Sequence, residues 1–140
     1  MLSVNNKKLL TREQFNELTF KRDKYKCVFC SNKKIVSHHI IDRKLFSDGG
    51  YYLDNAASVC DEHHWCVEKT DISVEDVRKA CGITNIVLPE GFDASKIYDK
   101  WCNIILSNGR RKPGPMFFEE NVQKVLREKL WLFDIEYENY

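Results

Sequence analysis

The histidines of this chain stand in two adjacent pairs, His38–His39 and His63–His64, which account for all 4 histidines in the sequence. Neighbouring side chains on a strand point to opposite faces, so the two members of a doublet have different surroundings. A free imidazole titrates near neutrality and accepts a proton from water, whereas an imidazole bound to a metal ion does not. The doublets therefore predict a division of labour between a metal ligand and a general base.

Cysteines spaced for a metal ion lie on either side of the first doublet. Cys27 and Cys30 form a Cys-x2-Cys pair, and about 30 residues further on Cys60 and His63 form a Cys-x2-His pair. Each short pair allows one turn to present two ligands to one ion, and thiolate with imidazole favours zinc over harder ions. These four residues are the predicted ligands of a structural Zn²⁺ site. Cys66 is an alternative to His63 as the fourth ligand, although it lies further along the predicted helix.

The remaining cysteines are expected to be reduced thiols, because a cytosolic setting disfavours disulfides. Cys81 and Cys102 have no partner at metal spacing, and we interpret them as buried thiols. The N-terminus has lysines without a following apolar region, so no signal peptide is predicted. The sequence contains no run of 18 apolar residues, so no membrane span is predicted. We therefore expect a cytoplasmic protein without a membrane partner.

Short elements must position these ligands. Thr11 and Gln14 form a capping box that predicts a helix over residues 11–23. Residues 35–41 are β-branched and apolar and predict a buried strand, and residues 57–60 predict a second short strand. A helix is expected to begin near Asp61 and to carry the second doublet. Such a small unit has little core of its own and usually requires a metal.

The second half of the chain predicts further helices separated by loops. Ser73 begins a helix that Gly82 ends, and residues 117–131 have apolar residues at helical spacing. These apolar residues are Val122, Val125, Leu126 and Leu130. Residues 88–93 and 107–115 are rich in turn formers and predict loops.

Charge is distributed unevenly along a chain of 140 residues and net charge +1. Residues 1–44 carry 11 Lys/Arg and 4 Asp/Glu, whereas residues 45–140 carry 11 and 17. A basic half beside an acidic half is compatible with a surface that faces phosphates. The hydrophobic content of 43% is typical of a globular protein.

Taken together, these motifs resemble the HNH endonuclease family and its ββα-metal fold. The resemblance rests on "FKRDKYKCVFC", "SHHII", Asn55 and "VCDEHH" and covers about residues 15–70. Counted from Asn55, Cys60, His63 and His64 stand at +5, +8 and +9, the offsets of two zinc ligands and one catalytic-metal ligand in the family. The departure is His63, where a cysteine is usual. The resemblance implies an α+β fold, a small zinc-stabilised ββα-metal core with helical N- and C-terminal additions.

The resemblance also implies a role for each matched residue. His38 and His64 are expected to bind the catalytic divalent ion (Mg²⁺, Mn²⁺ or another), and His39 to be the general base that activates water. Asn55 is expected to hold the loop that orients this base. Glu68, one helical turn after His64, is either a further ligand or a partner of the ligands. The products would carry a 3′-hydroxyl and a 5′-phosphate.

Basic residues around the first cysteine pair and the first strand predict a nucleic-acid surface. The expected contacts are Lys24, Lys26, Arg43 and Lys44. Arg22 belongs to the same basic run, and residues 110–112 are a second candidate contact. DNA is favoured over RNA as the partner, although the chemistry at phosphorus is the same for both.

The expected function is hydrolysis of nucleic-acid phosphodiester bonds by an endonuclease with a histidine base and one divalent ion. Residues 1–70 would form the nuclease core with its N-terminal helix, and residues 71–140 a helical and looped appendage packed on it. The alternative is a zinc-stabilised module that binds nucleic acid or protein without cleaving it. A bacterial or phage source is compatible with the resemblance.

Overall fold

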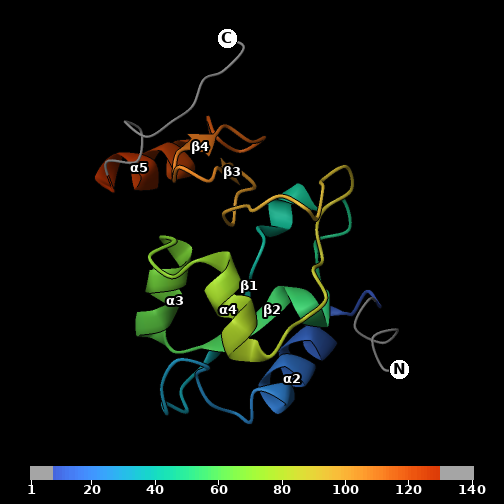
Figure 1. The fold of residues 1–140 in the computed structure, drawn as a ribbon. Coiled ribbons are helices and arrows are strands. Elements are labelled where there is room, and N and C mark those ends of the chain that lie inside the picture. Colours follow the sequence, from blue (N-terminus) through green and yellow to red (C-terminus); the bar gives the residue numbers. More distant parts are fainter. Residues whose placement is uncertain (1–7, 130–140) are drawn as a thin grey trace.

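A computed structural model describes residues 8–129, and this part of the chain is a mixed α+β structure with two small antiparallel sheets (Figure 1). The predicted α+β class is therefore confirmed. The elements in chain order are α2 (Arg12–Arg22), β1 (Val36–His39), η1 (Arg43–Leu45), η2 (Leu53–Asn55), β2 (Ala56–Val59), α3 (Asp61–Glu68), α4 (Val74–Cys81), β3 (Ile104–Ile105), β4 (Arg111–Lys112) and α5 (Glu120–Glu128). No helix in the described residues is long and apolar enough to cross a membrane.

Helix α2 begins at the predicted capping box. The Gln14 amide donates to the Thr11 hydroxyl at 3.1 Å, and the Thr11 amide donates to the Gln14 side chain at 3.0 Å. Two of the N–H groups that a helix leaves without an intrahelical partner are satisfied in this way. The helix buries Phe15 and Thr19 and packs on both strands of the central sheet.

The central sheet pairs β1 with β2 and positions the first histidine doublet. The strands are antiparallel, with His38 opposite Ala57 and His39 opposite Ala56. Every residue of β2 is buried, whereas β1 has exposed Val36, buried His38 and partly buried Ser37 and His39. Cys60 follows β2 and is the N-cap of α3, so the second doublet enters the helix in its first turn. The two strands and the helix that the sequence predicted here are confirmed.

Helix α4 also follows its local signals. The Ser73 hydroxyl accepts a hydrogen bond from the Asp76 amide at 3.1 Å, which caps the N-terminus. Gly82 ends the helix with φ 71°, a left-handed conformation that costs glycine little because it has no Cβ. The predicted start and end of this helix are both confirmed.

A hairpin replaces part of the loop predicted over residues 107–115. Strand β3 pairs with β4, and the Leu106 amide donates to the Arg110 carbonyl at 2.8 Å across a turn that contains Asn108 and Gly109. The turn residues were read correctly from the sequence. The strands were missed because two-residue strands are too short to produce an alternating pattern.

One hydrophobic core joins the two halves of the chain. Ile40 and Ile41, directly after β1, and Val59 of β2 pack with Val77 of α4 and with Tyr98 of the segment that follows it. Figure 1 shows α5, β3 and β4 grouped at one end of the molecule and α2 at the other.

Helix α5 forms a second, smaller hydrophobic cluster. Val122 and Leu126 are fully buried in it with Trp101 and Phe117, and Val125 packs against its edge. The predicted apolar face of α5 is therefore confirmed over these residues. Leu130, the last residue of the predicted pattern, lies outside the described residues.

Candidate functional site

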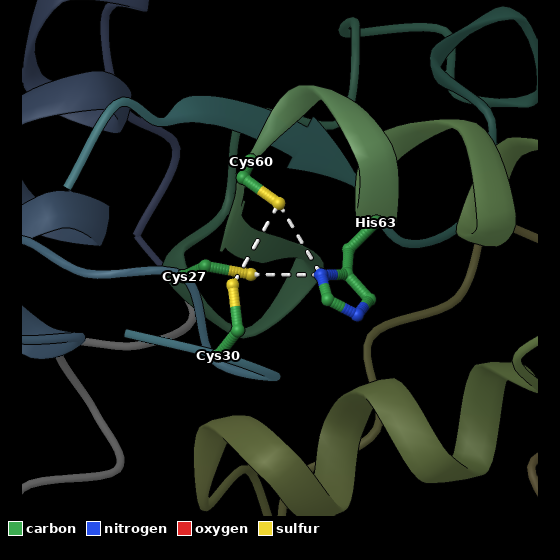
Figure 2. Close-up of side chains that lie close together, drawn as sticks. All are labelled: Cys27, Cys30, Cys60 and His63. Carbon is green, nitrogen blue, oxygen red and sulfur yellow. Dashed lines mark hydrogen bonds between the residues drawn. The ribbon is translucent and has the colours of Figure 1, made fainter. Parts of the chain in front are cut away.

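The four predicted zinc ligands converge in the structure (Figure 2). The distances are 3.6 Å from Cys27 Sγ to His63 Nδ1, 3.2 Å from Cys60 Sγ to His63 Nδ1 and 3.8 Å from Cys30 Sγ to Cys60 Sγ. A tetrahedral ion with Zn–S of about 2.3 Å and Zn–N of about 2.0 Å places its ligand atoms roughly 3.5–3.8 Å apart. The cluster therefore has the dimensions and the donor chemistry to hold a metal ion such as zinc.

Two local turns present these ligands from opposite sides. Cys27 and Cys30 lie in the turn after α2, and the Phe29 amide donates to Cys27 Sγ at 3.5 Å. Cys60 and His63 lie at the N-terminus of α3. A hydrogen bond from the His63 backbone, together with the neighbouring His63 and cysteine side chains, lowers the pKa of Cys60 to about 7. The thiolate, which is the form that binds metal, is favoured accordingly.

The other three cysteines lie outside this cluster. Cys66 is not among the four residues that converge, so the structure gathers His63 rather than its alternative. Burial raises the pKa of Cys81 and of Cys102 to about 12. Both pack in or against the main core, as the sequence predicted for buried thiols.

A second cluster contains His38 and His64, the predicted ligands of the catalytic ion, together with Glu68. Glu68 Oε1 lies 3.6 Å from His38 Nδ1 and 3.2 Å from His64 Nε2. His38 comes from β1, whereas His64 and Glu68 lie one turn apart on α3. The pairing of the central sheet with α3 is therefore what brings the three side chains together.

The protonation states of this cluster suit a divalent cation. His38 is 3% exposed, and burial lowers its pKa to about 4, which keeps the imidazole neutral at neutral pH. Its buried Nδ1 has no hydrogen-bond partner among the described residues. Burial opposes ionisation of Glu68, but His38, His64 and Lys100 hold the pKa of this carboxyl well below its usual range. Two imidazoles and one carboxylate are a donor set that divalent metals accept.

His39 is not a member of the second cluster, and its ring packs against aromatic side chains. Its ring stacks on Phe15 with centroids 4.6 Å apart and meets Tyr51 edge to face at 5.0 Å. Burial lowers the pKa of His39, and a hydrogen bond with the Gly49 backbone partly offsets this effect. Its Nε2 has no hydrogen-bond partner within the described part of the chain. The ring is thus fixed and predominantly neutral at neutral pH, and its unpartnered Nε2 is buried.

Asn55 fastens the loop between the two strands. Its side-chain oxygen accepts from the Ile41 amide at 2.9 Å, and its Nδ2 donates to the carbonyls of Ile41 and Gly50, each at 3.2 Å. The Asn55 carbonyl also accepts from the Ile40 amide at 2.9 Å. The side chain is thus buried between the end of β1 and the glycine pair that contacts His39. Asn55 thus connects the segment after β1 with Gly50, and its expected role in orienting the base stays a prediction.

One pocket of about 500 Å³ joins the histidines to basic side chains. Its lining includes His38, His39, His64 and Glu68 together with Arg12, Arg43, Lys44 and Lys100. Arg43 and Lys44 were predicted as nucleic-acid contacts. Lys24 and Lys26 are exposed in the turn before Cys27 and do not line the pocket.

Two arginines considered for nucleic-acid contact are instead used inside the fold. Arg22 donates to the carbonyls of Leu53 at 2.8 Å and Ala56 at 2.6 Å. Arg111 is 8% exposed and pairs with Asp99 at 3.0 Å. We correct the interpretation of both residues, because burial and internal partners keep them from acting as surface contacts.

Arg12 and Lys100 are pocket residues that sequence reasoning missed. Lys100 lies 36 positions after His64, in an apolar and aromatic stretch with no motif. Arg12 was read only as part of a helix. A charged residue in such surroundings gives no local signal, so only the packing of distant segments identifies it.

Comparison with known proteins assigns no family to the chain. No family model matches it, and neither curated proteins nor solved structures give a significant match. The protein is therefore described by the features of its own structure. These are a small α+β fold, a Cys/His cluster able to hold a metal such as zinc, and a basic pocket that contains three histidines.

Proposed function

We propose that this protein is a metal-dependent endonuclease of the HNH type that hydrolyses phosphodiester bonds in nucleic acid, DNA in preference to RNA. One observation carries the proposal. A candidate ion cluster and a histidine with an unpartnered Nε2 line the same basic pocket. A nuclease needs these three features together, namely a cation site, a base and a surface that attracts phosphates.

The residues of the pocket divide the work as follows. His38, His64 and Glu68 would hold the divalent ion, which supplies positive charge to offset the charge that develops on the phosphate. His39 Nε2 would accept a proton from the attacking water, whose oxygen forms the new bond to phosphorus. The bond to the 3′ oxygen breaks, and this oxygen leaves as a hydroxyl after taking a proton from solvent. Arg43 and Lys44 would contact the nucleic-acid backbone.

Burial and packing make His39 suitable as the base. Its lowered pKa keeps the imidazole unprotonated at neutral pH, so that it is ready to accept a proton. Phe15 and Tyr51 restrict the ring, which reduces the ordering required when the substrate binds. Asn55 would act indirectly, by holding the loop that contacts the His39 ring.

The proposal is tested by a cleavage assay on supercoiled plasmid, single-stranded DNA and structured RNA, each with Mg²⁺, Mn²⁺ or EDTA. We expect the wild type to cleave plasmid only when a divalent ion is present. His39→Ala should lose about 100-fold or more in rate while keeping zinc and the fold. Lys79→Ala, an exposed change on α4 outside the pocket, is the matched control and should cleave at the wild-type rate.

Two results would contradict the proposal. If His39→Ala cleaves as fast as the wild type, the base is wrongly assigned. If the folded, zinc-loaded wild type cleaves none of the three substrates, the protein is better described as a zinc-stabilised binding module. Cleavage of RNA alone would keep the chemistry and change the substrate.

A further inference from the structure

We propose that Lys100, a residue of the C-terminal half, is a positioning residue that holds one oxygen of Glu68 and thereby limits how tightly the pocket binds its divalent ion. The inference rests on the proposed function, because it concerns the same ion cluster. It assigns part of the second half of the chain to the pocket itself.

Lys100 shares the Glu68 carboxylate with the two histidines. Its Nζ forms an ion pair with Glu68 Oε2, while Oε1 of the same carboxylate faces His38 and His64. Nζ also lies 3.9 Å from Asp42 Oδ2. Lys100 is 5% exposed and lines the pocket. A lysine is seldom buried to this extent unless it is paired, and here two carboxylates provide the pairing.

Buried hydrogen bonds fix the backbone of the segment that contains Lys100. The buried Asp99 carboxylate accepts hydrogen bonds from the amides of Trp101 and Asn103 and from the side chains of Asn103 and Arg111, each at 3.0 Å. The Lys100 carbonyl accepts from the Asp42 amide at 2.9 Å, which joins the segment to the loop after β1. The backbone on both sides of Lys100 is therefore fixed by buried partners.

Close packing adds to this constraint. Cys102 adopts φ 59°, a conformation that side chains rarely adopt. Gly114 lies so close to it that an added Cβ would be 2.2 Å from the Cys102 carbonyl oxygen. Gly114 also donates its amide to the Asn103 side chain at 2.7 Å. The β3–β4 hairpin and the chain after it thus hold the turn that carries Lys100.

This geometry predicts an opposition between Lys100 and the ion. An ion held by His38, His64 and Glu68 Oε1 would lie close to an ammonium group on Oε2, and the two positive charges repel each other. With Oε2 occupied, Glu68 offers the ion a single oxygen. More of the ion's coordination positions then remain available for water and phosphate, as a catalytic site requires. Lys100 would thus reduce affinity while preserving an open site.

The experiment measures Mn²⁺ binding to the full-length, zinc-loaded protein by calorimetry, without substrate. Lys100→Met and Lys100→Gln remove the charge, and we expect both to bind Mn²⁺ about tenfold more tightly than the wild type. Lys100→Arg keeps the charge and should bind within about twofold of the wild type. Lys96→Met is the matched control on the same segment, since Lys96 is exposed and does not line the pocket.

The cleavage rate at saturating Mn²⁺ is a second measurement, and there we expect removal of the Lys100 charge to lower the rate. We expect kcat of Lys100→Met to fall about tenfold although its ion binds more tightly, because Glu68 would then engage the ion with both oxygens. A residue that only stabilises the fold would not raise affinity. Thermal unfolding of each variant establishes that the comparison is made between folded proteins.

The outcomes separate the two proposals. Unchanged or weaker Mn²⁺ binding by folded Lys100→Met and Lys100→Gln overturns the role of Lys100, even if the wild type cleaves DNA. Absence of Mn²⁺ binding in the wild type and in both neutral variants also overturns it. Tighter binding by the variants, with no cleavage of any substrate by the wild type, supports the role of Lys100 and contradicts the nuclease.

Discussion

The Cys/His cluster and the histidine pocket are built in opposite ways. The cluster takes its ligands from two turns, each with a spacing of three residues, Cys27 to Cys30 and Cys60 to His63. The pocket instead combines side chains from α2, β1, α3 and the segment that carries Lys100. A local pair depends on one turn, whereas the pocket depends on the packing of the whole domain. The two regions should therefore fail under different changes.

The histidine pocket should depend on the Cys/His cluster, whereas the cluster should not depend on the pocket. Helix α3 carries His63 of the cluster and His64 and Glu68 of the pocket. An ion bound by the cluster would join the turn after α2 to the start of α3, and so would hold α3 against the sheet. Loss of the cluster should therefore destroy the pocket, whereas loss of pocket residues should leave the cluster intact.

The largest effect is expected from removing the metal of the cluster. Cys27→Ala, or treatment with a chelator, should destabilise the fold by on the order of 5 kcal/mol or more, because metal binding in so small a unit is coupled to folding. Mn²⁺ binding in the pocket should be lost at the same time. Zinc content and thermal unfolding measure the first effect, and calorimetry measures the second.

Cys66→Ala is the control for this change, since Cys66 lies outside the cluster. It should keep its zinc and change stability by about 1 kcal/mol or less. A stable, metal-free Cys27→Ala protein with an intact Mn²⁺ site would contradict the dependence of the pocket on the cluster.

An intermediate effect is expected at Asn55. Asn55→Ala removes three hydrogen bonds made by a buried side chain, which should cost about 3 kcal/mol. The loop that contacts His39 would lose its attachment, so cleavage should fall while the protein still binds zinc. Urea unfolding, zinc content and the cleavage rate measure these effects on one sample.

Asn32→Ala is the matched control, because within residues 8–129 the Asn32 side chain accepts a single, exposed hydrogen bond, from the Lys34 amide. It should cost less than about 1 kcal/mol and leave cleavage unchanged. Zinc loss from Asn55→Ala would show that the cluster also depends on the pocket.

The smallest effect separates basic residues of the pocket from those near the cluster. Arg43→Ala with Lys44→Ala should weaken the binding of duplex DNA about tenfold and reduce the salt dependence by roughly two charges. Lys24→Ala with Lys26→Ala should weaken binding only about twofold, since these residues do not line the pocket. Fluorescence anisotropy over a range of salt, in a His39→Ala background, measures both. Equal losses would mean that the binding surface extends over the turn before Cys27.

Local rules made a large part of the molecule predictable. Thr11 with Gln14, and Ser73 with Gly82, determine helix ends through hydrogen bonds and backbone conformations that involve only a few neighbouring residues. The ligand pairs of the cluster follow the same logic, because a spacing of three places two side chains on one turn. The different surroundings of His38 and His39 were predictable for a similar reason, since adjacent strand residues face opposite sides.

The sequence by itself thus determined most element positions and the two ligand pairs of the Cys/His cluster, because each depends on short-range geometry, and the resemblance supplied the α+β class. Tertiary structure alone decided that Lys100 enters the pocket, that Arg22 and Arg111 are used internally, and that β3 and β4 pair. These contacts join residues distant in sequence, and the shared core selects them. Many sequences satisfy the packing of such a core, so the side chains that it brings together leave no local pattern.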